Sequence, residues 1–186
     1  MSNSRRQIEA WLKTIDVKGD VADVGGLFWP VKGRTKTWDV NNYHIWDVHP
    51  GRKGVRTNVV CDFNKRLPVY LEYDHVFCLE TTDHFWNLGQ AFTNMSLLGR
   101  MGSLIHISSN FLFPHHTGQD HVRLTIVGLT TLLEKAGYKV IDVKPRYAAD
   151  EGLPRALDLE SKVQYHRGEI GYMVTAQKYG GPQISQ

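Results

Sequence analysis

The stretch VADVGGLFWPVKGR, residues 21–34, decides how the fold is interpreted. It begins as an apolar run, continues with an acid and reaches Gly25 and Gly26, the order found where the first strand of a nucleotide-binding sheet ends. A dinucleotide fingerprint would carry a third glycine farther on, where this chain has the sequence FWP at 28–30. A lone Gly-Gly pair is most often a plain structural turn. The neighbouring segments must therefore decide whether this loop meets a ligand.

Two acidic residues follow the next two apolar runs in a regular series. The run YHIWDV, residues 43–48, carries Asp47 near its end, about twenty residues after the glycines, where a carboxylate can accept hydrogen bonds from both hydroxyls of a ribose. The run TNVVCDF carries Asp62, which could accept a hydrogen bond from an adenine amino group. Gly25 and Gly26 would let the backbone approach the same ligand closely. Three successive strands thus deliver suitable groups to one edge of a parallel sheet.

Hydrophobic patterning predicts a single domain over residues 1–186. Helices are predicted over 5–15, 85–99 and 123–138, and strands over 21–24, 43–48, 57–63, 73–80, 103–113, 139–145 and 169–178. Strands alternate with helices early in the chain, which favours an α/β fold with a mostly parallel sheet. The final two strands have no clear helix between them and predict an antiparallel C-terminal pair. Residues 146–168 are a candidate lid.

Composition narrows the class of protein. The 186 residues are 41% hydrophobic and 22% charged, with a net charge of +3, which permits a phosphate-rich partner without requiring one. Cys61 and Cys78 lie in apolar runs and are interpreted as buried hydrophobes, and no zinc-ligand spacing occurs, so no metal is expected. No apolar run approaches the ~20 residues that span a bilayer. The polar N-terminal segment is not typical of a signal peptide, which favours a cytoplasmic protein.

These motifs together resemble the class I S-adenosylmethionine-dependent methyltransferases, in particular the type 11 methyltransferase family. VADVGG resembles the family's first motif, YHIWDV its acidic second motif and VVCDFN its third. YDHVFCLETTDHFWN resembles the fourth strand and following loop, and LLGRMGSLIHISS the turn into the fifth strand. FPHHTGQDHVRLTIVGLTTLLEKAGYKV resembles a segment common in members from surface-polysaccharide gene clusters. The resemblance covers about residues 5–145.

The resemblance implies a Rossmann-like sandwich that binds S-adenosylmethionine and releases S-adenosylhomocysteine. The implied cofactor-binding residues are Asp23, Gly25, Gly26, Asp47, Asp62, Phe63, Leu79 and Glu80. The chain departs from the family in the loop after Gly26, where Trp29 and Pro30 replace the glycine-rich tail. Trp29 could close over the site or pack on adenine.

Methyl transfer from a sulfonium needs positioning, exclusion of water and, for some oxygen or nitrogen acceptors, a base. The candidate bases are His84, His115 and His116, each of which could instead make structural hydrogen bonds. Candidate substrate residues are Trp86, Asp120 and Arg123. Asp120 and Arg123 could equally form a salt-bridged pair at the start of the helix.

The leading interpretation is a methyltransferase acting on a small molecule or glycan precursor. A nucleic-acid methyltransferase is disfavoured, because its usual proline-containing motif is missing from ETTDHFW and the net charge is modest. A dehydrogenase is disfavoured by the incomplete glycine fingerprint. A non-catalytic cofactor-binding or interaction protein of the same fold stays open because of the altered loop. Edge strands at both ends of the predicted sheet leave a homodimer open as well.

Overall fold

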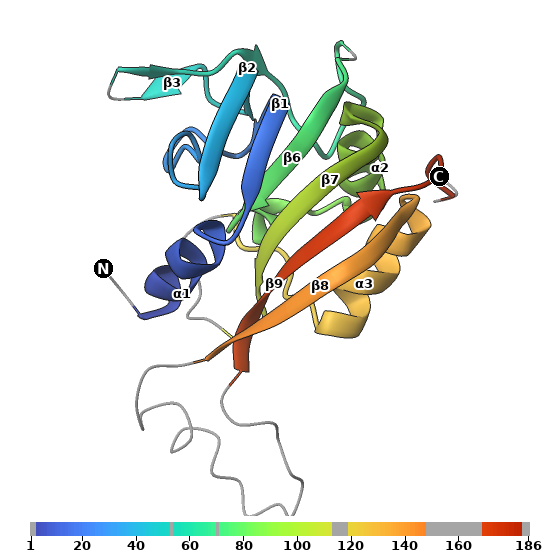
Figure 1. Ribbon diagram of the computed structural model, residues 1–186. Helices are drawn as coiled ribbons and strands as arrows, with labels where there is room; N and C mark the ends of the chain where they lie inside the picture. The colour runs from blue at the N-terminus through green and yellow to red at the C-terminus, as the bar shows by residue number, and fades with distance from the viewer. Residues whose placement is uncertain (1–2, 53, 70, 113–118, 148–168, 184–186) are drawn as a thin grey trace, which may run out of the picture.

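The computed structural model describes residues 3–52, 54–69, 71–112, 119–147 and 169–183. Its helical elements are α1 (Asn3–Leu12), the 3-10 helix η1 (Thr82–His84), α2 (Leu88–Leu98) and α3 (Ile126–Lys135). The long strands are β1 (Asp16–Val24), β2 (Thr37–Asp47), β6 (Tyr73–Leu79), β7 (Gly99–Asn110), β8 (Tyr138–Tyr147) and β9 (Glu169–Lys178). The short strands are β3 (Gly51–Arg52), β4 (Val55–Arg56) and β5 (Val59–Val60). Figure 1 shows how these elements are arranged.

A seven-stranded sheet in the order β5-β2-β1-β6-β7-β9-β8 forms the centre of the molecule. The strands β5, β2, β1, β6 and β7 pair in parallel, whereas β9 pairs antiparallel with both β7 and β8. The prediction of a mostly parallel sheet with an antiparallel C-terminal pair is therefore confirmed. A separate two-stranded hairpin, β3–β4, projects beyond the end of β2 (Figure 1).

The two faces of the sheet are covered by different helices (Figure 1). On one face, α2 and α3 bury Phe92, Met95 and Leu129 against apolar side chains of the central strands. On the other face, α1 buries Trp11 and Leu12 in a second cluster. The spacing of apolar residues along each helix produces these buried stripes. Strands covered on both faces explain the nearly continuous apolar sequence of β6, residues 73–79.

The expected early alternation of strands and helices is wrong in detail. The β1–β2 connection, residues 25–36, contains no helix, and neither do the described parts of the connections from β2 to β5 and from β5 to β6. Pro30 and Gly33 interrupt the first of these connections, and Gly33 adopts a φ of 72°, which suits turns rather than helices. β1 and β2 still pair in parallel, because the helix-free loop between them makes the crossover connection that a helix usually makes.

The boundaries of the remaining elements follow local capping chemistry. The helix predicted over 85–99 begins at Leu88, because the Asn87 side chain accepts a hydrogen bond from the backbone N–H of Gln90. The helix predicted over 123–138 begins at Ile126, after Thr125 accepts from Gly128 in the same way. Within the described residues, no helix is both long and apolar enough to cross a membrane.

Candidate functional site

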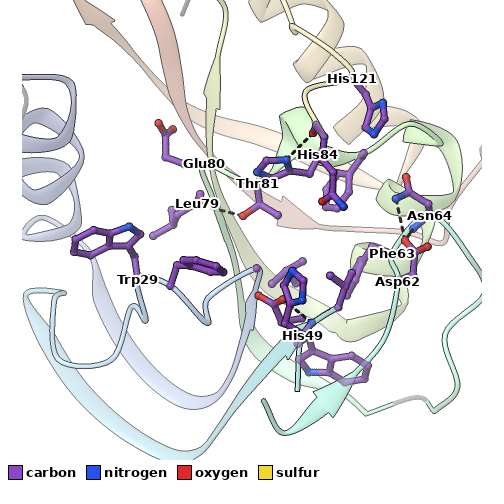
Figure 2. Close-up of a pocket in the computed structure, with 18 of the residues that line it drawn as sticks. Trp29, His49, Asp62, Phe63, Asn64, Leu79, Glu80, Thr81, His84 and His121 are labelled. Atoms are coloured by element: carbon purple, nitrogen blue, oxygen red, sulfur yellow. Dashed lines mark hydrogen bonds between the residues drawn. The ribbon is translucent and has the colours of Figure 1, made fainter. Parts of the chain in front are cut away.

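A cavity of about 780 Å³ lies at the edge of the sheet where the parallel strands β1, β2 and β6 end. This is where ligands bind in open α/β sheets. Figure 2 shows how its side chains converge, with Trp29 and Glu80 at one end and Asp62, Phe63 and Asn64 at the other. Of the predicted site residues, the cavity is lined by Gly25, Asp47, Asp62, Phe63, Leu79, Glu80, His84 and Trp86.

Gly25 is required by the geometry at the end of β1. Its φ is 73°, and a Cβ atom added there would lie 2.3 Å from Oγ1 of Thr81. Its N–H donates to the carbonyl of Trp46, at 2.8 Å, which fixes the loop against β2. A side chain at Gly25 would therefore displace Thr81, which is itself part of the cavity wall.

Asp23 lies beneath the loop and does not line the cavity. Its Oδ2 accepts hydrogen bonds from the Val31 N–H, at 2.7 Å, and from the Tyr43 hydroxyl, at 2.5 Å. Burial raises the pKa of Asp23 to about 6, although both hydrogen bonds act in the opposite direction. Gly26 also lies outside the lining and backs onto Asp23, since a Cβ there would meet the Asp23 carboxyl at 2.2 Å. Asp23 therefore anchors the loop after β1 through its hydrogen bond with Val31, and Gly26 packs against the Asp23 carboxyl group.

The loop that departs from the glycine-rich pattern is tied to α1. Arg34 binds both carboxylate oxygens of Glu9, at 2.6 and 3.2 Å, and donates to the Trp29 and Pro30 carbonyls. The Arg5 guanidinium carbon lies 3.4 Å from the centre of the Trp29 ring. This loop is therefore an ordered wall of the cavity, with Trp29 at its rim.

Two carboxylates lie at the ends of β2 and β5, as the sequence predicted. Asp47 is nearly buried, and its Oδ1 accepts the backbone N–H of His49 at 3.0 Å. Burial acts to raise the pKa of Asp62, but hydrogen bonds from Asn64 and the nearby Lys65 outweigh it, so the pKa is lowered. Asp62 is therefore a stable acceptor at neutral pH.

Aromatic residues form the wall next to these carboxylates. Phe63 stacks on Phe85 with ring centroids 6.2 Å apart, and Trp46 meets Phe63 edge-on at the same separation. A flat apolar surface beside a hydrogen-bond acceptor suits a purine base.

Glu80 is held in an unusual conformation at the end of β6. Its φ is 53°, the one positive value for a non-glycine residue in the described part of the chain. The fully buried Arg146 lies 3.0 Å from Oε1 of Glu80, and the Ser108 hydroxyl donates to the same oxygen at 2.9 Å. Such a backbone costs about 1–3 kcal/mol and persists where the surroundings enforce it.

Arg146 joins several segments around the cavity. Its guanidinium donates to the Ser4 hydroxyl of α1, at 2.8 Å, and to the Ser109 carbonyl and the Asn110 side chain at the end of β7, both at 2.9 Å. Nothing in the local sequence pattern of β8 predicts this role, because the contacts join residues more than thirty positions apart.

His84 has a defined hydrogen-bonding state at one nitrogen. Its Nδ1 lies 2.7 Å from the Gln119 carbonyl, which can only accept, so Nδ1 carries the hydrogen. In the neutral ring Nε2 is then the basic nitrogen. His121, which sequence reasoning missed, lines the cavity beside His84 (Figure 2). The backbone N–H of His121 donates to the Asp83 carbonyl, which fastens this segment to η1.

The other residues predicted to bind substrate or act as a base lie at the rim of the cavity, away from it or outside the described residues. Asp120 and Arg123 form a salt bridge with each other and do not line the cavity. Trp86 is exposed at the rim. His115 and His116 lie outside the described residues, as does most of the candidate lid, residues 148–168.

The cavity also contains residues that sequence reasoning missed, including Arg5, Phe28, Asn64 and Thr81. Asn64 and Thr81 directly follow predicted residues, so proximity to those motifs was an available signal. Arg5 carries no such signal, since only the packing of α1 brings it to the strand ends.

Comparisons with known proteins identify the fold. No protein-family model matches the chain, and no curated protein matches its sequence. Solved structures match over nearly its full length. An S-adenosylmethionine-dependent methyltransferase from Mesorhizobium loti is 12% identical with a TM-score of 0.65, over 94% of this chain and 98% of that one. The N-methyltransferase NodS of Bradyrhizobium japonicum, solved with S-adenosylhomocysteine, is 11% identical with a TM-score of 0.64, over 95% and 88%.

The [4+2]-cyclase SpnF is similar to the same degree, at 14% identity and a TM-score of 0.62, over 96% of this chain and 81% of that one. The chain therefore has the class I methyltransferase fold. Because this fold also supports a cyclase, function must be argued from the site.

Proposed function

We propose that this chain is an S-adenosylmethionine-dependent methyltransferase that acts on a small molecule or a glycan precursor. The observation that carries the proposal is the convergence of Gly25, Asp47 and the Asp62–Phe63 pair on one cavity at the carboxyl edge of the sheet. Each group matches a different part of the cofactor, and all three belong to neighbouring strands or the turns that follow them.

The residues fit the cofactor chemically. Asp47 would accept hydrogen bonds from the ribose hydroxyls, Asp62 would accept one from the adenine amino group, and Phe63 would contact the base. The absence of a Cβ at Gly25 leaves room for Thr81, which lines the cavity at the end of β6. Leu79 and Glu80 would bound the methionine end. When bound, the cofactor supplies an electrophilic methyl group on a sulfonium.

His84 is proposed as the base for an acceptor that must lose a proton. The Gln119 carbonyl fixes the hydrogen on Nδ1, so that Nε2 can accept a proton from an acceptor hydroxyl or amine. Once an acceptor is found, His84→Asn should lower kcat by about 10²-fold or more and leave cofactor affinity unchanged. Unchanged kcat in His84→Asn would instead assign this histidine a structural role.

A small-molecule or glycan acceptor is supported by the dimensions of the site. About 780 Å³ falls within the range of small-molecule cavities. Exposed Trp29 and Trp86 at the rim offer flat apolar surfaces of the kind on which sugar or aromatic rings pack.

The second candidate is a non-catalytic cofactor-binding or interaction protein. The observation that favours it is the loop at 28–30, whose aromatic side chains occupy the place of a glycine-rich tail. Under this alternative the cofactor could bind without turnover.

Calorimetric titration with S-adenosylmethionine and S-adenosylhomocysteine tests the proposal. We expect micromolar affinity in the wild type and a loss of about tenfold or more in Asp47→Ala, because two ribose hydrogen bonds disappear. Asp39→Ala is the matched control, since Asp39 is an exposed carboxylate on the same strand. If folded wild-type protein binds neither ligand, the methyltransferase proposal is wrong.

A further inference from the structure

Two arginines stack on the two consecutive aromatic residues of the loop after β1. The Arg5 guanidinium carbon lies 3.4 Å from the centre of the Trp29 ring, and that of Arg52 lies 4.0 Å from the centre of the Phe28 ring. Both aromatic residues line the cavity, yet Phe28 is 50% exposed and Trp29 is 63% exposed. We call these four residues the arginine–aromatic rim.

The rim is assembled from elements that are distant in sequence. Arg5 comes from α1 and Arg52 from the β3–β4 hairpin, and both meet the loop that follows β1. Stacking engages the flat face of a guanidinium, whereas its N–H donors lie in the plane of the group. A stacked arginine is therefore oriented to bind a carboxylate or phosphate along its edge.

Two carboxylates, Glu9 and Glu80, act electrostatically on Arg5 of the rim. Both carboxylate oxygens of Glu9 are hydrogen-bonded by Arg34, while Arg5 lies farther away, at 3.8 Å. Arg5 and Arg34 thus share the Glu9 carboxylate. Burial and the nearby Arg34 lower the pKa of Arg5, while Glu9 and Glu80 act to raise it.

The segment that contains the hairpin is basic in sequence. No acidic residue occurs between Asp47 and Asp62, whereas Arg52, Lys53 and Arg56 all lie in that stretch. His49, which lines the cavity and precedes the hairpin, contacts Phe28 edge-on, and Arg52 of the hairpin stacks on the same ring.

We propose that the arginine–aromatic rim binds an anionic group, a phosphate or a carboxylate, on the methyl acceptor. Both guanidiniums stack on residues that line the same cavity, which favours a compact anion over an extended polyanion, which needs a broad basic face. This inference rests on the proposed methyltransferase function and assigns a role to the loop that departs from the glycine-rich pattern. Aromatic side chains there provide the platforms on which the arginines are oriented.

Titration of isotope-labelled protein with inorganic phosphate, followed by NMR, tests the rim. We expect saturable shifts of the Trp29 indole N–H and of the Arg5 and Arg52 side-chain N–H signals, measured against sodium chloride at equal ionic strength. Arg5→Gln and Arg52→Gln should each weaken phosphate binding about fivefold, and the double variant should abolish it. A parallel titration with acetate measures the preference between phosphate and carboxylate.

Arg6→Gln and Arg56→Gln are the matched controls, because these exposed arginines lie on the same helix and the same hairpin. Shifts that do not saturate, or equal losses in the control variants, would overturn the proposal.

S-Adenosylhomocysteine and methylthioadenosine, which lacks the amino-acid carboxylate, are titrated separately. If Arg5→Gln weakens binding of S-adenosylhomocysteine and not of methylthioadenosine, Arg5 binds the carboxylate of the cofactor itself. The proposal that Arg5 binds the methyl acceptor is then wrong. Absence of S-adenosylhomocysteine binding in the wild type would contradict the methyltransferase function instead.

Discussion

The Tyr43 hydroxyl donates a 2.5 Å hydrogen bond to Oδ2 of Asp23, the same oxygen that accepts the N–H of Val31. This arrangement joins β1, β2 and the far end of the cavity loop through one buried carboxyl group. Because Asp23 is almost fully buried, its ionisation state affects how firmly the loop is held and how stable the protein is.

Replacing Asp23 with asparagine should change the pH dependence of stability. The pKa of Asp23 is raised from 3.8 to about 6, so its contribution is fully present below pH 3.8 and is lost as pH rises through 6. The asparagine side chain cannot ionise and would not lose this contribution. Urea unfolding from pH 4 to 7 should show Asp23→Asn gaining up to about 3 kcal/mol relative to the wild type. A difference that is constant with pH would contradict this assignment.

A pair of stacked histidines predicts sensitivity to acid. Nδ1 of His75 lies 3.1 Å from Nε2 of His106, whose Nδ1 lies 3.2 Å from the Thr175 hydroxyl. Burial, and then His75, lowers the pKa of His106 to about 3. The neutral form is therefore favoured on folding, and this stability is lost as pH falls below 6.5 toward 3.

Wild-type protein should accordingly lose about 3 kcal/mol from this group between about pH 7 and about pH 4.5. His106→Gln can still hydrogen-bond and cannot be protonated, so its loss over that range should be smaller by this amount. Chemical unfolding at several pH values measures the difference. His49→Gln, at an exposed histidine, should behave like the wild type, and a parallel effect there would show that the acid sensitivity arises elsewhere.

Much of the fold follows from local sequence. The apolar runs place the long strands, and the order of glycines and acids along them places Gly25, Asp47 and Asp62 at one edge. This succeeds because parallel strands bring their carboxyl ends together, so that one-dimensional order becomes proximity.

The contacts that complete the site could not be predicted in this way. Asp23 resembles a ligand-binding acid in sequence, yet the loop folds over it and uses it as an anchor. Arg146 lies on β8 and Arg5 on α1, both distant in sequence from their partners. Only tertiary packing brings Arg146 near Glu80 and Arg5 near Trp29. Long-range side-chain contacts leave no periodic signal in the sequence.

Gly25 and Gly33 provide a matched pair of substitutions. Their φ values are 73° and 72°, so the backbone strain of alanine should cost about 1 kcal/mol of stability at either position, and the contact with Thr81 adds to this cost at Gly25. A Cβ at Gly25 would meet Thr81, whereas nothing lies within 4 Å of a Cβ at Gly33. Gly25→Ala should therefore weaken S-adenosylhomocysteine binding by about tenfold or more, and Gly33→Ala should not. Calorimetry distinguishes the two variants, and equal affinities would mean that the position of Thr81 does not affect ligand binding.

The ion pair between buried Arg146 and partly buried Glu80 predicts strong energetic coupling. Arg146→Met removes the charge that faces Glu80 and should destabilise the protein by about 3 kcal/mol, because a partly buried carboxylate loses its partner. Adding Glu80→Gln removes that carboxylate as well. The double variant should therefore be more stable than Arg146→Met alone, by about 1–2 kcal/mol. Urea unfolding of all four proteins gives the coupling energy directly. Additive effects would mean that Arg146 stabilises the fold through Ser4, Ser109 and Asn110 and not through Glu80.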